Sequence, residues 1–191
     1  MTEIDSIVPR SADQANTAAF AGVAEALRFS YGYRQRGLPD TLARYQRRGG
    51  DPSVFDGIEE RAAWAGDIRR RIGTLHPTRQ AVLIVRFAPR ASPCACRRPC
   101  CSGWARNEEW TESLSRLVDD AIQAVPGQIS NRQLRLGIVR RWAGADRTNL
   151  QIIAEKCGVH RNTAGKQAKS IRRWLDQLEA AALQDADNCL T

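Results

Sequence analysis

Apolar residues recur every three or four positions in one segment of this chain after another, and a helix-capping signal precedes most of these segments. Such spacing gathers the apolar side chains on one face of a helix, where they can pack against a neighbouring helix. The clearest runs cover residues 54–72, 110–122 and 164–182. We therefore expect an all-α protein built from several packed helices.

The first 90 residues are expected to contribute four helices. A capping box at residues 11–14 begins a helix that ends near Ser30. A Pro near the first turn predicts helix starts at 38–40 and at 51–52, and glycines end these two helices at 49–50 and 73. The apolar run within 79–88 fits a buried helix or a strand, and we favour the helix.

Residues 89–106 form a stretch that cannot be a regular helix or a central strand, because it holds Pro89, Pro93 and Pro99. We expect an irregular loop in the middle of the chain. Four cysteines fall within eight of its residues: Cys94, Cys96, Cys100 and Cys101.

These cysteines suggest a zinc site, since thiolates at about 2.3 Å from one zinc ion would order such a loop. The C-x-C spacing with an adjacent C-C pair differs from the usual pair of C-x2-4-C knuckles, so His76 could replace one sulfur. Thiols that bind no metal, and a redox switch, stay open as alternatives. Disulfides are disfavoured, because we expect a cytoplasmic protein: the acidic N-terminus lacks the features of a signal peptide, and no apolar stretch is long enough to span a membrane.

The chain has a formal net charge of +8, and the positive charge is concentrated in two blocks. Residues 61–106 hold ten arginines and one aspartate, whereas residues 140–175 hold nine basic and two acidic side chains. This distribution points to a polyanionic partner, the alternative being a solvated basic surface.

Residues 150–164 have the pattern of two helices joined by a tight turn. Ala154 is small where the helices would cross, and Gly158 tolerates the left-handed backbone that ends the first helix. Val159 supplies an apolar side chain between the helices, and Ala164 is expected to face inward. This segment resembles a helix-turn-helix. With the helix expected at 131–143, the last third of the chain looks like the promoter-reading domain of bacterial sigma factors.

This resemblance implies that the second helix enters the major groove of DNA. The residues that match its exposed N-terminal face, and so are candidates to read bases, are Arg161, Asn162, Thr163, Lys166 and Gln167. Candidates for phosphate contacts are Lys169, Arg172, Arg173, Arg140, Arg141 and Arg147. A purely structural helical hairpin, or contacts to protein or RNA, remain alternatives.

The change from acidic to basic sequence near Pro126-Gly127 suggests a domain boundary. We expect a helical domain at 1–125 with the cysteine-rich loop at 89–106, a DNA-binding domain at 126–184 and a flexible acidic tail at 185–191. A homodimer is expected, because a single helix-turn-helix reads few base pairs.

The sequence therefore favours a transcription regulator that binds specific duplex DNA and is not an enzyme. Its organisation also resembles phage late-gene antiterminators and activators, which implies RNA polymerase as a partner. A recombinase or nuclease that uses Asp119 and Asp120 is the remaining alternative. The chain has only two histidines and no phosphate-binding glycine loop, which disfavours an enzyme.

Overall fold

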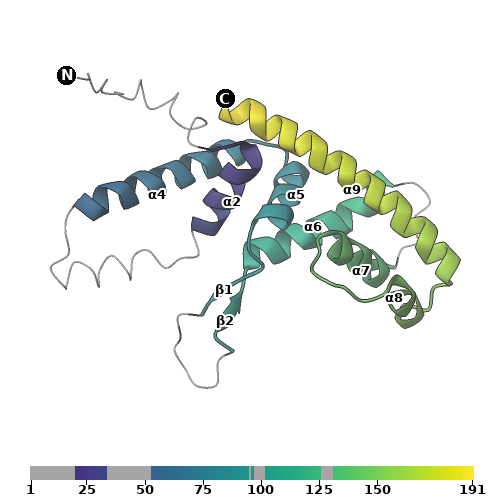
Figure 1. The fold of residues 1–191 in the computed structure, drawn as a ribbon. Coiled ribbons are helices and arrows are strands. Elements are labelled where there is room, and N and C mark those ends of the chain that lie inside the picture. Colours follow the sequence, from purple (N-terminus) through teal and green to yellow (C-terminus); the bar gives the residue numbers. More distant parts are fainter. Residues whose placement is uncertain (1–19, 34–52, 95, 97–101, 126–130) are drawn as a thin grey trace, which may run out of the picture.

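The computed structural model describes residues 20–33, 53–94, 96, 102–125 and 131–191, with the backbone alone for 53–60 and 93. These residues form seven helices and two short strands (Figure 1). The helices are α2 (Val23–Tyr33), α4 (Ser53–Ile72), α5 (Pro77–Phe87), α6 (Glu108–Ala124), α7 (Arg132–Trp142), α8 (Leu150–Lys156) and α9 (Arg161–Leu190). The apolar run within 79–88, predicted to be a helix with a strand as the alternative, belongs to helix α5.

The all-α expectation is wrong in one respect, because a small β-hairpin borders the cysteine-rich segment. Strands β1 (Ala91–Pro93) and β2 (Trp104–Arg106) are antiparallel, with Ala91 opposite Arg106 and Pro93 opposite Trp104. A two-stranded ribbon has only edge strands, so a proline is tolerated there although a central strand would exclude it. The fold is mostly helical, with this minor hairpin.

Five of the helices begin at a side chain that accepts a backbone N–H of the first turn, as in typical N-caps. The capping residues are His76, Asn107, Asn131, Asn149 and His160. Capping boxes at 130–133 and 148–151 predict helix starts near Asn131 and Asn149. Both starts are confirmed, but with these asparagines as the caps. Thr148 is not a cap, and Ser130 lies outside the described residues.

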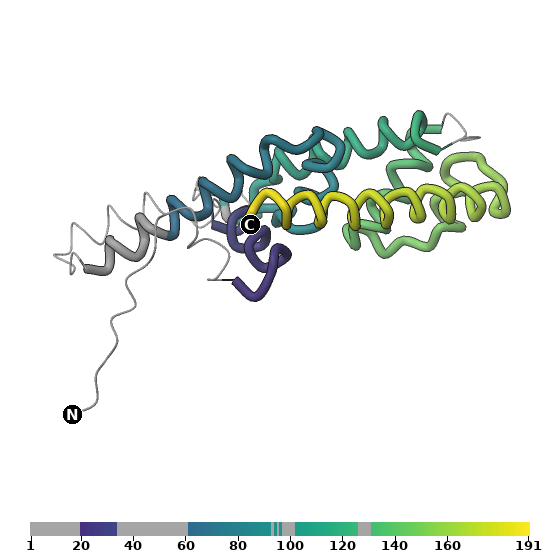
Figure 2. The backbone as a smooth tube through the Cα atoms, turned by 90° about the horizontal axis from the view of Figure 1, so that it is seen from above, coloured from purple at the N-terminus to yellow at the C-terminus, as the bar shows by residue number. Residues whose placement is uncertain are grey.

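One apolar cluster contains buried residues from every described helix. Helix α9 runs along much of the helical body, with its first turns beside α7 and α8 and its last turns beside α2 and α4 (Figure 2). It also packs on α5. The helices before and after the proposed boundary at residues 126–127 therefore share a core, and the boundary itself lies outside the described residues.

The tail expected to be flexible is instead the end of α9. The helix continues to Leu190, and both Ala186 and Leu190 are buried. Asp185 forms an ion pair with Arg79 of α5, and the guanidinium of Arg71 donates to the carbonyl of Cys189. The end of α9 is therefore docked by an ion pair to α5 and by a hydrogen bond from α4 to its backbone.

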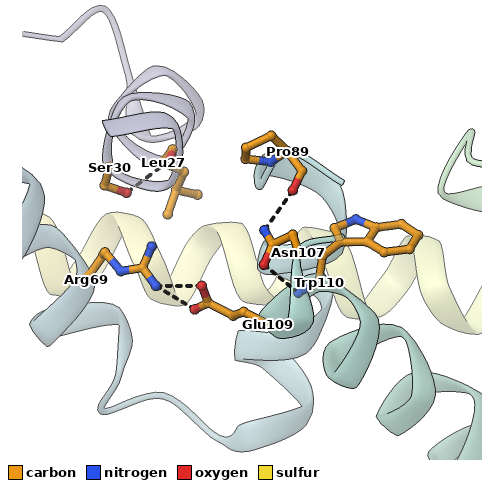
Figure 3. A network of polar contacts seen from close by, with 7 residues as sticks. All are labelled: Leu27, Ser30, Arg69, Pro89, Asn107, Glu109 and Trp110. Carbon is orange, nitrogen blue, oxygen red and sulfur yellow. Dashed lines mark hydrogen bonds and ion pairs between the residues drawn. The ribbon is translucent and has the colours of Figure 1, made fainter. Parts of the chain in front are cut away.

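A polar network joins α4 to the start of α6 (Figure 3). Arg69 donates to both carboxylate oxygens of Glu109, at 2.6 and 2.7 Å, and its guanidinium lies 4.9 Å from the centre of the Tyr31 ring. Asn107 caps α6 and donates from Nδ2 to the carbonyl of Pro89 at 2.7 Å. The same asparagine therefore fixes the two ends of the segment that contains the hairpin.

Two expected features lie outside the described residues: the helix start at 11–14 and the helix at 38–50.

Of the apolar face expected on α6, Ile122 is exposed, whereas Trp110, Leu114 and Leu117 are buried. None of the described helices is long and apolar enough to cross a bilayer.

Candidate nucleic-acid interface

The connection from α8 to α9 is a tight turn at Gly158, as the sequence predicted. Gly158 has a φ of +65°, in the left-handed region that favours glycine. The N–H of Gly158 donates to Glu155 and that of Val159 to Ala154, at 3.0 and 2.9 Å, so the turn satisfies carbonyls at the end of α8. His160 then caps α9, accepting the N–H of Asn162 at Nδ1.

Small residues let α7, α8 and α9 approach one another closely. Ala154 and Ala164 are buried, as expected, and Val159 packs against the core. Sequence reasoning missed Gly137 of α7: a Cβ there would lie only 2.6 Å from Cγ2 of Ile153 on α8. The sequence did contain a signal for this close approach: a glycine in the middle of an expected helix lowers helix propensity, which suggests that another element needs the space.

Side-chain hydrogen bonds to backbone fix the beginning of α7. Asn131 donates to the carbonyl of Cys157 at 3.1 Å, which ties the start of α7 to the end of α8. Arg135 is buried and donates to the carbonyl of Val118 on α6 at 3.1 Å. The three C-terminal helices are therefore held to one another and to α6.

The first turns of α9 divide into a buried and an exposed face. Ala164, Ile171 and Leu175 are buried. The exposed face contains most of the residues predicted to contact DNA: Arg161, Asn162, Lys166, Lys169, Arg172 and Arg173. Thr163 is half-buried.

Gln167 does not belong to the exposed face, contrary to our expectation. It is only 5% exposed, and within the described part of the chain its Oε1 atom has no hydrogen-bond partner. Three residues after Ala164 and four before Ile171, it follows the helical spacing of the inward face. The resemblance to helix-turn-helix proteins implied an outward position, and the burial of Gln167 removes it from the candidates for base reading.

The two basic blocks of the sequence differ in how their charge is used. On α4 and α5, arginines form ion pairs within the protein: Arg69 with Glu109, Arg70 and Arg71 with Asp67, Arg79 with Asp185 and Arg86 with Glu179. Among the described residues, no ion pair involves the basic residues of α9. The C-terminal block therefore presents its charge to solvent, whereas much of the first block is neutralised internally.

The connection between α7 and α8 adds further basic residues to this region. Arg140 and Arg147 are exposed, as a phosphate contact requires. Arg141 is half-buried and donates to the carbonyl of Thr148, so it holds the connection in place. Asp146 accepts the N–H of Thr148 at 2.8 Å, and its hydrogen bonds with Thr148 lower the pKa of that carboxyl.

A groove of about 720 Å³ lies between α7, the start of α8 and α9. Ile138, Trp142 and Leu150 contribute apolar surface to it. Basic side chains line it as well: Arg141, Lys169, Arg172 and Arg173. The groove borders the exposed face of α9 and continues its positive charge.

The predicted metal ligands lie only partly within the described residues. Cys94 is half-buried and donates its N–H to the carbonyl of Gly103 at 2.8 Å, and Cys96 is exposed. Cys100 and Cys101 lie outside the described residues, and among the rest no group of three or more His, Cys, Asp or Glu side chains could hold a metal ion. His76 accepts the N–H of Thr78 at Nδ1, as the cap of α5.

Asp119 and Asp120, the carboxylates considered for a nuclease or recombinase, both interact with other side chains. Asp119 pairs with Arg132 at 2.9 Å, and this hydrogen bond is the main cause that lowers the pKa of Asp119. Asp120 accepts a hydrogen bond from the hydroxyl of Thr78 at 2.8 Å. Their roles in this structure are contacts between surface elements.

No protein-family model matches the chain, and no curated protein matches it. Proposals about its function therefore depend on the geometry and chemistry of its own residues.

Proposed function

We propose that this protein is a transcription regulator that binds specific duplex DNA, with α7, α8 and the first turns of α9 as a helix-turn-helix. One observation carries the proposal: after the turn at Gly158, α9 presents Arg161, Asn162 and Lys166 to solvent, and within the described residues no acidic side chain pairs with them. In a helix-turn-helix, residues at this position of the second helix contact base edges in the major groove.

The side chains on this face are chemically suited to read bases. Arg161 and Lys166 can donate to the N7 and O6 acceptors of guanine, and Asn162 can pair in a bidentate manner with adenine. These three residues lie within six positions of one helix, so they can reach neighbouring base pairs from the same groove.

Phosphate contacts are proposed for basic residues around this face. Arg172 and Arg173 follow farther along α9, and Arg140 and Arg147 lie before α8; all four are exposed. The N-terminus of α9 adds the positive end of a helix dipole. The bound duplex would be held on both sides of the groove that α9 enters.

The test is selection of bound fragments from a random duplex library by the full chain, followed by titration of the enriched duplex against a scrambled one. Binding at least a hundredfold tighter to the enriched duplex is expected, within the usual range of specific over non-specific affinity. Absence of any enriched sequence would contradict sequence-specific binding of duplex DNA by these helices.

We also propose that the cysteine-rich segment binds zinc. The pairing of β1 with β2 supports this proposal, because it joins the backbone before the four cysteines to the backbone after them. The hydrogen bond from the N–H of Cys94 to the carbonyl of Gly103 extends this pairing by one residue. Zinc would be bound there through thiolates, with a structural role. Metal analysis of the purified chain, with Cys96→Ser as the comparison, tests this: about one zinc per chain is expected, falling in the variant.

A further inference from the structure

The β1–β2 hairpin is outside the interface proposed for α9, yet its surface suggests a ligand. Trp104 of β2 is 62% exposed, more than any other large apolar side chain among the described residues. An indole presents a wide flat surface, which water solvates poorly and which suits contact with sugars or bases.

The charge of the hairpin indicates a polyanionic ligand. Residues 88–107 contain four arginines and neither aspartate nor glutamate. Arg106, two residues after Trp104, is exposed and, within the described part of the chain, forms no ion pair. It differs in this from Arg69, Arg79 and Arg86, which come from the same basic block but pair with acids. An exposed aromatic ring beside unpaired arginine is a combination found on nucleic-acid-binding surfaces.

The base of the hairpin is fixed beside the α7–α8 connection. Asn107 donates its N–H to the carbonyl of Arg90 at 3.0 Å, which closes the hairpin at its base. The guanidinium of Arg90 then donates to the carbonyl of Ala143, directly after α7, at 3.0 Å. From there the hairpin projects away from the helices, and both it and α8 lie at the lower edge of the view in Figure 1.

We propose that the hairpin makes a second contact with the duplex that α9 reads. Arg106 contacts phosphates, and Trp104 lies in the minor groove that flanks the α9 site, against the sugars and without reading the bases. This proposal rests on the proposed function, because the α9 site determines which flank the hairpin meets. It extends the interface past the α7–α8 connection, so that one chain covers more base pairs than a helix-turn-helix alone.

The experiment compares two duplexes. One carries the selected sequence with about one helical turn of flank on each side, and the other is trimmed to the base pairs whose substitution lowers affinity. For Trp104→Ala in the full chain we expect affinity about tenfold below wild type on the long duplex and equal to wild type on the trimmed one. Arg106→Ala should act in the same way and reduce the salt dependence on the long duplex by about one phosphate contact.

Ile122→Ala, which truncates another exposed apolar side chain, is the matched control and should behave as wild type on both duplexes. Equal affinities of Trp104→Ala and wild type on the long duplex, or an equal loss on both duplexes, overturn the hairpin contact while leaving the α9 site intact. Loss of binding to RNA polymerase in Trp104→Ala, with both DNA affinities unchanged, assigns the hairpin to a protein partner and also overturns it. Failure of the wild type to distinguish selected from scrambled duplex contradicts the proposed function itself.

Discussion

Trp142 at the end of α7 donates its indole N–H to the carboxylate of Asp176 in the middle of α9, with 2.8 Å between nitrogen and oxygen. On the same ring, the guanidinium of Arg86 lies 5.0 Å from the centroid, and Arg86 also pairs with Glu179 of α9. The indole thus connects α5, α7 and α9. This arrangement positions the exposed face of α9 relative to the helices that precede it.

Trp142→Phe should keep most of the packing and remove this hydrogen bond. We expect the free energy of unfolding to fall by about 1.5–3 kcal/mol, the usual net value of a hydrogen bond to a charged group. Urea denaturation measures the change. Trp104→Phe is the matched control: its indole is largely exposed, and it should leave the urea midpoint unchanged. Equal effects of both substitutions would show that the bond to Asp176 contributes nothing.

Gly158→Ala should destabilise the α8–α9 turn by about 1 kcal/mol, because an alanine at φ of +65° is strained. Nothing lies within 4 Å of a Cβ at this position, so the backbone conformation alone is tested. Gly165→Ala provides the comparison, since that position is helical and equally open. It should stabilise the protein by up to about 1 kcal/mol. Thermal unfolding of the two variants should therefore shift in opposite directions.

Gly137→Ala should destabilise the protein by about 1–3 kcal/mol, because the new methyl group overlaps the branched side chain of Ile153. The double variant Gly137→Ala/Ile153→Ala removes the obstructing atoms, so its loss should be smaller than the sum of the two single losses. A double-mutant cycle in urea measures this coupling. Strict additivity would mean that α7 and α8 adjust without strain.

Gln167→Leu distinguishes a buried residue from a base-reading one. The buried amide oxygen of Gln167 has no partner among the described residues, so its replacement should leave stability unchanged or raise it by about 1 kcal/mol. The preference for the selected duplex should be unaffected. A large loss of DNA discrimination, with stability intact, would return Gln167 to the reading face.

Arg161→Ala and Arg173→Ala should differ in their effects on DNA binding. The first should lower the affinity for the selected duplex more than for a scrambled one, since it removes a contact with a base edge worth about 1–3 kcal/mol. The second should weaken both similarly and reduce the salt dependence by about one phosphate contact. Titrations at several salt concentrations separate the two roles. Equal losses on all sequences from both variants would contradict the assignment.

Features that depend on neighbouring residues in the sequence were predictable. The cap at Asn107, the helix starts near Asn131 and Asn149, the left-handed Gly158 and the inward Ala164 all follow from local backbone chemistry and helical spacing. Such features need no knowledge of which segments meet in space. The starts of α7 and α8 and the turn before α9 were therefore expected at the right places.

Features that depend on distant partners were not predictable in the same way. The docking of the C-terminal turns requires Arg71 and Arg79, more than 100 residues away, and the pairing of β1 with β2 spans the cysteine segment. Likewise, net charge could not distinguish arginines paired with acids from those left exposed on α9. Gln167 differs from these features, because its burial was predictable from the sequence. Its spacing of three residues from Ala164 indicates an inward position, whereas the resemblance to a recognition helix implied an outward one.

Helix α9 is one continuous element from Arg161 to Leu190, and its far end is held by the Arg79–Asp185 pair. Arg161 and Asp185 are 24 positions apart, which corresponds to about 36 Å of helix at about 1.5 Å per residue. A helix of this length works as a lever: a tilt of about 5° at the anchored end moves the other end by about 3 Å, the scale of a hydrogen bond. The direction in which Arg161 and the first turns of α9 point therefore also depends on how Asp185 is attached to Arg79 at the other end of the helix.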